Sequence, residues 1–205
     1  MTIRLHRGDL PDLSHYRVAA VAVDTETMGL ALGRDRLCVV QLSPGDGSAD
    51  VVQIPAAGIE APNLKRLLAD PAVLKIFHFA RFDLGVLSEA LGLMPGPVYC
   101  TKIASRLART YTDKHGLKDL TRELLGIDLS KQQQLSDWGA ADLTDAQVSY
   151  AAADVLHLHA LKHKLDAMLA REGRAALAKA CFGFLPDRVR LDVAGWALED
   201  IFAHS

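Results

Sequence analysis

The first residues whose types and spacing allow chemistry are two carboxylates at the end of an apolar run. Asp24 and Glu26 stand two positions apart and follow residues 18–23, which predict a short buried strand. In a strand, residues two apart share a face, with backbone positions roughly 6.5–7 Å apart. Neighbouring negative charges repel each other, and a divalent cation relieves that repulsion. The pair therefore indicates a metal site, and a solvated strand end is the alternative.

Two further acids lie in predicted helices. Asp83 stands in the first turns of a helix predicted over residues 80–91, where an acid also stabilises a helix N-terminus. Tyr150 and Asp154 stand four apart in a later helix, so their phenol and carboxylate share one helix face. For this pair, the alternative is a core tyrosine beside an unrelated exposed acid.

The order of these five residues along the chain is more specific than any of them alone. It resembles the DEDDy 3′–5′ exonucleases of the ribonuclease D superfamily, which have a ribonuclease H-like fold. The histidine subclass carries a histidine five positions before the last acid, where this chain has Ser149, so the tyrosine subclass is the match. The chain is also similar to the nano-RNase C family over essentially its whole length, notably in residues 24–30, 36–41, 100–105 and 110–116.

This resemblance implies phosphodiester hydrolysis with two divalent cations, Mg²⁺ or Mn²⁺. Asp24 would bridge both cations, and Glu26 and Asp154 would complete their coordination. Asp83 would hold the second cation directly or through water, and Tyr150 would orient the attacking water. Carboxylate oxygens suit these hard cations, and two cations about 4 Å apart stabilise the attacking and leaving oxygens. These five residues are therefore the predicted catalytic residues.

The resemblance also implies a very short RNA substrate. Diribonucleotides such as pGpG would be the natural end point, and mononucleotides the product. Leu30 resembles the leucine that wedges between two bases in enzymes that cut dinucleotides, with a core position as the alternative. His78 is expected either to contact the substrate phosphate or to pack at a strand end. Gln134 is a weaker candidate for substrate binding.

A basic helix face is another candidate for substrate binding. Lys102, Arg106 and Arg109 are spaced by four and three residues, which places them on one face of a helix predicted over 101–109. Such a face is usually solvated, and here it is expected to meet the 5′-phosphate of the substrate or a neighbouring subunit. The family resemblance implies a ring-like homo-octamer, and the apolar C-terminal segment is a candidate for its interface.

The elements that must position these residues indicate an α/β fold. The predicted strands cover residues 18–24, 37–42, 49–54, 73–79 and 98–100. Short connections join the first three into an antiparallel meander, whereas the later two alternate with helices. A capping box at Thr144 and Gln147 opens a long helix that reaches about residue 171. We therefore expect a ribonuclease H-like mixed sheet of five strands flanked by helices, in a single domain over residues 1–205.

The composition of the chain excludes several classes of protein. The chain has 205 residues, of which 50% are apolar, so it can bury a sizeable core. Its 23 Lys+Arg and 25 Asp+Glu give a net charge of −2, which argues against a protein that coats long nucleic acid. The three cysteines form no CxxC pair, which disfavours a disulfide framework or a structural zinc site. No signal peptide or membrane span is expected, and the predicted location is cytoplasmic.

Two other functions stay open from the residues alone. A ribonuclease D-like enzyme that trims the 3′ ends of structured RNA would prefer longer RNA and show a steep salt dependence. A non-catalytic nucleotide-binding scaffold would keep the fold and bind neither metal nor product.

Overall fold

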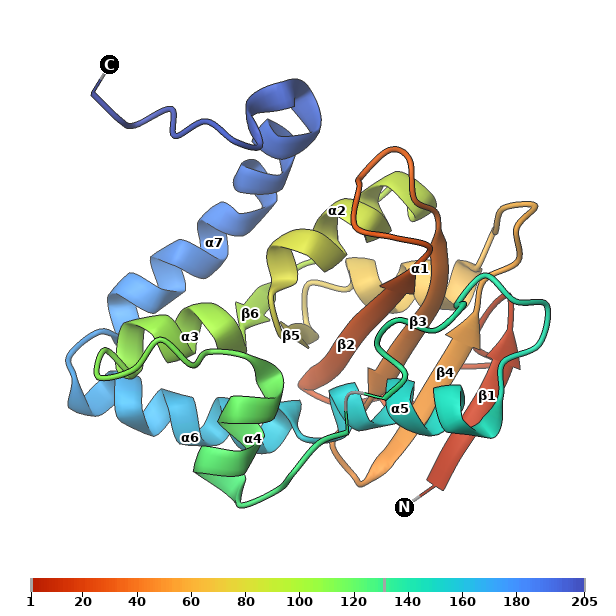
Figure 1. The fold of residues 1–205 in the computed structure, drawn as a ribbon, viewed down its shortest axis with the longest axis horizontal. Coiled ribbons are helices and arrows are strands. Elements are labelled where there is room, and N and C mark those ends of the chain that lie inside the picture. The colour runs from red at the N-terminus through yellow and green to blue at the C-terminus, as the bar shows by residue number, and fades with distance from the viewer. Residues whose placement is uncertain (1, 131, 205) are drawn as a thin grey trace.

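A six-stranded mixed sheet forms the centre of the protein, which a computed structural model describes over residues 2–130 and 132–204 (Figure 1). Met1, Lys131 and Ser205, including both ends of the predicted 1–205 domain, lie outside the described residues. The strand order is β1-β4-β3-β2-β5-β6. The strands are β1 (Thr2–Arg7), β2 (Ala20–Thr27), β3 (Leu37–Ser43), β4 (Ser48–Gln53), β5 (Leu74–Phe77) and β6 (Val98–Cys100).

The sheet confirms the predicted α/β class and the meander within it. β2 pairs antiparallel with β3, and β3 pairs antiparallel with β4. β5 runs parallel to β2, and β6 runs parallel to β5. β3 and β4 are buried along their whole length, because both faces of the sheet are covered there. This explains the nearly continuous apolar run of β3. In β4, the buried polar side chains of Ser48, Asp50 and Gln53 are hydrogen-bonded within the protein instead.

The predicted count of five strands is wrong, because β1 adds a sixth at the edge of the sheet. β1 pairs parallel with β4, and none of its residues is fully buried. Arg4 and His6 of β1 both hydrogen-bond to Asp50 of β4, which is buried. Polar contacts therefore hold this strand in place. The sequence of β1 lacks the continuous apolar run of a buried strand, and its alternation of polar and apolar residues is the pattern of a half-buried one, which the sequence analysis did not use.

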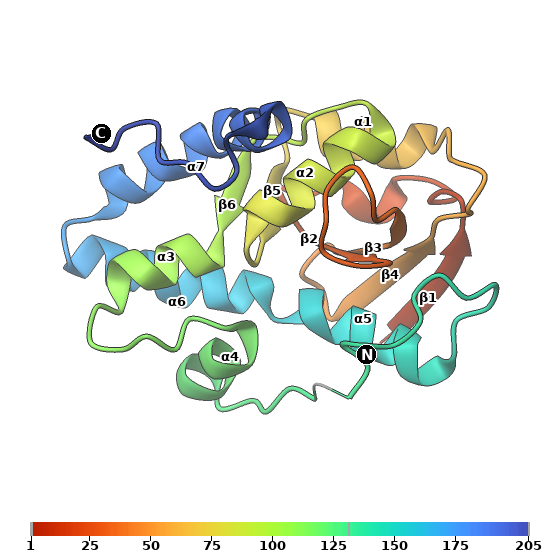
Figure 2. The same ribbon diagram turned by 45° about the horizontal axis from the view of Figure 1, so that its top comes forward.

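Helices cover both faces of the sheet. Figure 2 shows the strands between α5 on one side and α1 and α2 on the other. α6 contacts β5, α7 contacts β6, and α3 and α4 pack on α6. Among the described helices, none combines the length and the apolar character that a bilayer crossing requires. The helices are α1 (Pro62–Ala69), α2 (Ala80–Leu91), α3 (Thr101–Ala108), α4 (Leu117–Leu125), α5 (Asp145–Leu156), α6 (Leu158–Arg171) and α7 (Ala175–Leu191).

The predicted capping box is present, but the helix after it is shorter than predicted. The backbone N–H of Gln147 donates to Thr144 Oγ1 at 3.2 Å, and the Thr144 N–H donates to Gln147 Oε1 at 2.9 Å. The single helix predicted to residue 171 is divided into α5 and α6, which meet at His157. As a result α5 packs on β2, β3 and β4, while α6 packs on α3 and α4.

The C-terminal segment leaves the body of the protein after α7 (Figure 1). A turn of π-helix at Asp192–Trp196 ends α7. Asp192 accepts hydrogen bonds from Arg81 of α2 and Arg188 of α7, at 2.5 and 2.6 Å. Beyond this anchor the chain exposes large apolar side chains, among them Trp196, Leu198, Ile201 and Phe202.

Candidate active site

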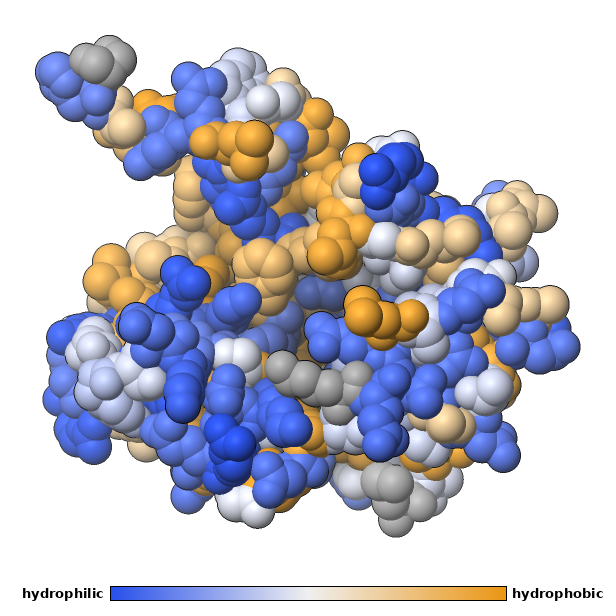
Figure 3. Space-filling model, viewed as in Figure 1, coloured by the Kyte–Doolittle hydropathy of each residue, from blue (hydrophilic) through white to orange (hydrophobic). Residues whose placement is uncertain are grey.

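A cavity of about 550 Å³ lies between β2, the N-terminal ends of α2, α3 and α4, and one face of α5. Figure 3 shows this face of the molecule hollowed near its centre. A further wall of the cavity is formed by Leu129, Ser130, Gln134, Leu135, Ser136 and Trp138. Nine of the residues predicted from the sequence line it: Asp24, Glu26, Leu30, His78, Asp83, Lys102, Gln134, Tyr150 and Asp154.

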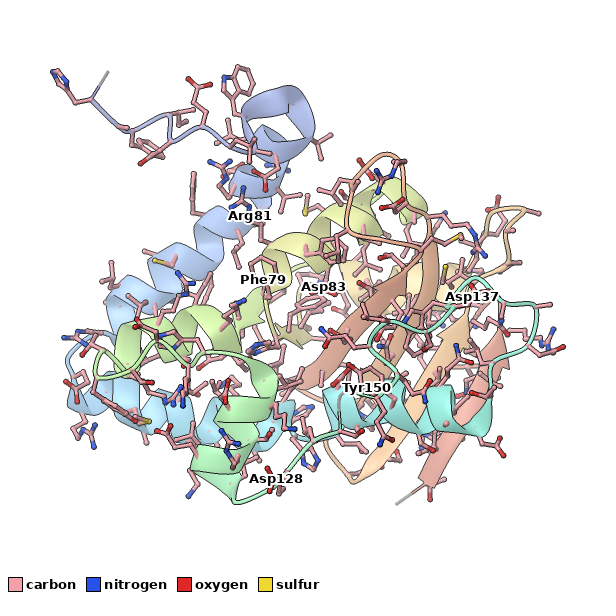
Figure 4. The ribbon with its side chains drawn as sticks, viewed as in Figure 1. Phe79, Arg81, Asp83, Asp128, Asp137 and Tyr150 are labelled. Atoms are coloured by element: carbon pink, nitrogen blue, oxygen red, sulfur yellow. The ribbon has the colours of Figure 1, made fainter. Side chains whose placement is uncertain are left out.

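Four carboxylates from three elements meet in this cavity, and we call Asp24, Glu26, Asp83 and Asp154 the acid cluster. Asp24 and Glu26 extend from the same face of β2 and Asp154 from α5, and each offers an oxygen within 4.8 Å of the other two. Asp83 approaches from α2, which begins shortly after β5, the parallel neighbour of β2. Figure 4 shows Asp83 and Tyr150 on α2 and α5, on either side of β2. The spacing in the sequence therefore predicted which acids converge.

Burial and mutual repulsion disfavour the ionised forms of the acid cluster. Burial, followed by the charges of its three acidic neighbours, raises the pKa of Asp24 well above its usual range. Burial, with Asp154 and Asp83 adding to it, raises the pKa of Glu26 to about 8. Burial raises the pKa of Asp83 and of Asp154 to about 7, although hydrogen bonds to Asp83, from Thr25 among others, and one from Tyr150 to Asp154 oppose the rise. The surroundings of the acid cluster do not neutralise the negative charge that its four carboxylates would carry when ionised.

The donor set fits divalent cations. Across residues 2–130 and 132–204, lysine and arginine side chains form ion pairs only with acids outside the acid cluster. The cluster offers only carboxylate oxygens, which are the ligands that Mg²⁺ and Mn²⁺ prefer. A cation among them replaces repulsion with attraction and favours the ionised carboxylates.

Tyr150 lies one helical turn from Asp154 on α5 and borders the same cavity. Burial, followed by the charges of Asp154, Glu26 and Asp24, raises its pKa above the ordinary tyrosine value. Its ring centroid lies 6.0 Å from that of Trp138, a buried residue of the cavity wall. Tyr150 therefore presents a neutral hydroxyl beside the acids, which can donate or accept a hydrogen bond.

His78 lies at the end of β5 in a defined hydrogen-bond arrangement. Its Nδ1 is 2.9 Å from Thr101 Oγ1, and that hydroxyl donates its own hydrogen to the Phe77 carbonyl at 3.1 Å. Because the hydroxyl hydrogen is already used, Nδ1 must be the donor in the first bond. Burial, with Lys102 adding to it, lowers the pKa of His78 to about 3. The imidazole is therefore neutral at pH 7, and Nε2 is a hydrogen-bond acceptor.

Leu30 and Gln134 lie at the rim of the cavity. The Leu30 side chain is 83% exposed, which excludes the alternative that it is a core residue. Gln134 is also exposed and belongs to the same wall as Leu129 and Trp138. Both side chains are free to contact a molecule in the cavity.

Lys102 and Phe79 form a pair on the opposite wall, and Phe79 was missed by the sequence analysis. Lys102 Nζ lies 4.2 Å from the Phe79 ring centroid, within the range of a cation–π contact. Phe79 is 46% exposed although it is aromatic, and its backbone is left-handed, with φ 68°. A non-glycine residue rarely adopts this conformation, and such strain concentrates at functional sites. No sequence pattern signals a left-handed phenylalanine.

Arg109 corrects the predicted basic face of α3. Lys102 lines the cavity and Arg106 is exposed, but Arg109 is completely buried. Its guanidinium pairs with Glu123 of α4 and donates to the Lys114 carbonyl at 2.8 Å. Arg109 is therefore not available to a substrate phosphate. It follows the last turn of α3, where the helical spacing no longer describes the direction of its side chain.

Comparisons with known proteins agree with this site. The profile of a family described as 3'-5' exonuclease matches residues 12–170. Ribonuclease D of Gluconacetobacter diazotrophicus is 39% identical over 154 residues, which are 75% of this chain and 39% of that protein. The chain thus spans about two fifths of the length of the curated relatives it matches.

Solved structures extend the similarity to the whole chain. NrnC of Brucella melitensis, determined with bound Mg²⁺, has a TM-score of 0.96 and 61% identity, with 100% of both chains covered. The same protein bound to pGG has a TM-score of 0.97 and 62% identity, again with 100% of both chains covered. Escherichia coli RNase D has a TM-score of 0.82 and 26% identity, covering 93% of this chain and 51% of that one. The chain therefore belongs to the 3′–5′ exonuclease family and, within it, to the ribonuclease D superfamily, as its motifs predicted.

Proposed function

We propose that this chain is a metal-dependent 3′–5′ exoribonuclease that hydrolyses short oligoribonucleotides, diribonucleotides such as pGpG among them, to mononucleotides. The observation that carries the proposal is the convergence of the acid cluster and Tyr150 in one cavity. The solved structure of Brucella melitensis NrnC bound to pGG, at 62% identity over the whole chain, supports a substrate of this length.

The predicted catalytic residues would hold two divalent cations, Mg²⁺ or Mn²⁺. We assign Asp24, Glu26, Asp83 and Asp154 as the ligands, because these carboxylates share the cavity and lack cationic partners among the described residues. When bound, the cations supply charge neutralisation for the phosphate and for the oxygens that attack and leave. The NrnC structure with bound Mg²⁺ supports the choice of metal.

Tyr150 would orient the attacking water through its hydroxyl. Since burial raises its pKa, the phenol keeps its proton at pH 7 and does not act as a general base. Its position one turn from Asp154 allows a water between the two side chains to be held by both groups.

The remaining predicted residues would bind the substrate. Leu30 would wedge between two bases, because its side chain is exposed at the cavity rim. Lys102 would attract the 5′-phosphate, and Gln134 would contact the substrate from the opposite wall. His78 presents an acceptor at Nε2, so a ribose hydroxyl suits it better than the phosphate oxygen considered from sequence.

We also propose that residues 1–205 act as one exonuclease domain in a homo-oligomer, an octamer by family resemblance. The exposed apolar side chains after α7 support an interface there, because such a surface gains stability when a partner covers it. The cytoplasmic location stays a prediction from the sequence.

A length series tests the proposed function. Initial rates are measured on 5′-labelled RNAs of about two, three, seven and twenty nucleotides, with Mg²⁺ and with a chelator. We expect the dinucleotide to be cleaved fastest and the chelator to stop all cleavage. A rate that increases with length instead supports ribonuclease D-like trimming, and absence of both cleavage and bound metal supports a scaffold.

A further inference from the structure

Gln41 is a buried polar residue in direct contact with the acid cluster. It lies in β3, in register opposite Asp24 of β2, and its side chain is fully buried. Its Nε2 donates a hydrogen bond to Asp24 Oδ2 at 2.9 Å. This is the orientation that an ionised, cation-bound carboxylate requires, because such a carboxylate only accepts hydrogen bonds.

The fold alone does not account for a glutamine at this position. Its Oε1 is buried and has no hydrogen-bond partner among the described residues, which destabilises the folded chain. Val39, which shares the face of β3 with Gln41, is apolar and buried, so an apolar side chain of similar size would pack at this position. The contact with Asp24 is the one interaction of the amide that carries a benefit.

We propose that Gln41 is a positioning residue that fixes the Asp24 carboxylate in the orientation that holds a divalent cation. The hydrogen bond restricts the rotation of the carboxylate, and the remaining lone pairs on its oxygens stay free for the metal. A ligand already fixed in this way loses less conformational freedom when the cation binds. This inference rests on the proposed function only in that Asp24 is a cation ligand.

Gln53 provides a matched control on the adjacent strand β4. It is also buried, and its Oε1 also lacks a partner among the described residues. Its Nε2, however, donates to the carbonyls of Ala140 and Ala141, at 3.0 and 3.2 Å, and touches no member of the acid cluster. Substituting either glutamine by methionine removes one buried amide and keeps a side chain of similar length. Only the substitution of Gln41 changes the surroundings of Asp24.

The test is a calorimetric titration of the full chain with Mg²⁺ in the absence of substrate. We expect Gln41→Met to weaken Mg²⁺ binding by about 10- to 100-fold, the usual effect of removing a hydrogen bond to a metal ligand. Gln53→Met should bind Mg²⁺ like the wild type. In turnover of pGpG, Gln41→Met should need more Mg²⁺ but show an unchanged KM for pGpG at saturating Mg²⁺. The inference is overturned if Gln41→Met binds Mg²⁺ like the wild type, or if Gln53→Met weakens binding equally.

A second variant keeps the test decisive if Gln41→Met does not fold. Gln41→Asn retains the amide but shortens its reach to Asp24, so it should show the same weakened Mg²⁺ binding. A wild-type protein that binds no Mg²⁺ overturns the inference as well. A wild-type protein that binds Mg²⁺ but does not cleave pGpG defeats the proposed function, and the comparison of Mg²⁺ affinities still decides the role of Gln41.

Discussion

Two buried acidic regions of this protein use carboxylates in opposite ways. Asp50 is only 2% exposed, and Arg4, Tyr16 and His6 all hydrogen-bond to its carboxylate. Burial disfavours its charged form, but the hydrogen bonds from Arg4, Tyr16 and His6 outweigh burial and lower the pKa of Asp50 to about 2. The acid cluster is also enclosed, yet its donors are neutral and its pKa values rise.

The difference distinguishes a structural acid from a ligand-binding one. Every oxygen of Asp50 is used within the protein, so the residue joins β1 to β4 and to the short helix at Ser14–Tyr16. The acid cluster keeps uncompensated charge that a bound cation can neutralise. Perturbed pKa values in a cavity are typical of such functional sites.

Asp24→Asn should have the largest effect on catalysis. Removing one charged ligand costs several kcal/mol of transition-state stabilisation, so we expect hydrolysis of pGpG to fall by on the order of 10³-fold. The circular dichroism spectrum should stay that of the wild type. Asp50→Asn is the control, and its kcat should change little where it remains folded. Wild-type turnover by purified Asp24→Asn protein would refute the assignment of the acid cluster.

Asp50→Asn should have the largest effect on stability. It leaves Arg4 without its carboxylate partner inside the edge of the sheet, which costs roughly 3 kcal/mol in comparable buried pairs. Asp24→Asn should instead leave the stability of the metal-free protein unchanged or raised, because it removes repulsion. Urea unfolding in the presence of a chelator measures both. Equal destabilisation by the two variants contradicts the distinction drawn between the regions.

In the metal-free protein, the acid cluster and Asp50 should change the stability with pH in opposite directions. The folded-state pKa values of Glu26, Asp83 and Asp154, about 8, 7 and 7, exceed the ordinary carboxyl values. At these three positions the folded chain therefore binds more protons than the unfolded one, so their contribution to stability should fall as pH rises from about 4 to about 8. The lowered pKa of His78 makes a smaller contribution of opposite sign up to about pH 6.5. Asp50 has a lowered pKa, so its contribution is present above about pH 4 and is lost as pH falls toward 2.

Saturating Mg²⁺ should abolish the loss of stability between about pH 4 and 8. It should leave unchanged the loss that Asp50 causes below about pH 4. Melting temperatures across this range, with Mg²⁺ and with chelator, check the prediction. If the stability measured with chelator is constant from pH 4 to 8, repulsion within the acid cluster does not destabilise the folded protein.

Lys102→Met should have the smallest effect. Lys102 is the lysine of the cavity wall that contacts Phe79, and it makes no ion pair with the acid cluster. We expect the KM for pGpG to rise by about tenfold with kcat nearly unchanged, since one phosphate contact of ordinary strength is lost. Arg106→Met, on the exposed side of α3, is the matched control and should leave KM unchanged. A change in kcat alone would assign Lys102 to the chemical step.

Local periodicity explains how much of the fold and site could be predicted. Alternation along a strand placed Asp24 and Glu26 on one face, and the four-residue spacing placed Tyr150 beside Asp154. The capping box fixed the start of α5 at Thr144. The position of a candidate side chain was therefore predictable wherever it depends on a regular element.

The parts that were missed depend on contacts between distant segments. β1 is held by its hydrogen bonds to Asp50, which no pattern within residues 2–7 announces. Arg109 follows the spacing of a solvated face but is buried against Glu123. Gln41 did carry a signal, since a glutamine within the apolar run 37–42 must satisfy its amide somewhere.

Arg109 has a consequence for how the cavity is built. Its bonds to Glu123 and to the Lys114 carbonyl fasten the connection between α3 and α4, and the first turn of α4 forms the cavity wall. That wall is secured from inside the helical layer, independently of the strands that carry Asp24 and Glu26. Substitutions in the first turn of α4 can therefore change the shape of the cavity without altering the strand that carries Asp24 and Glu26.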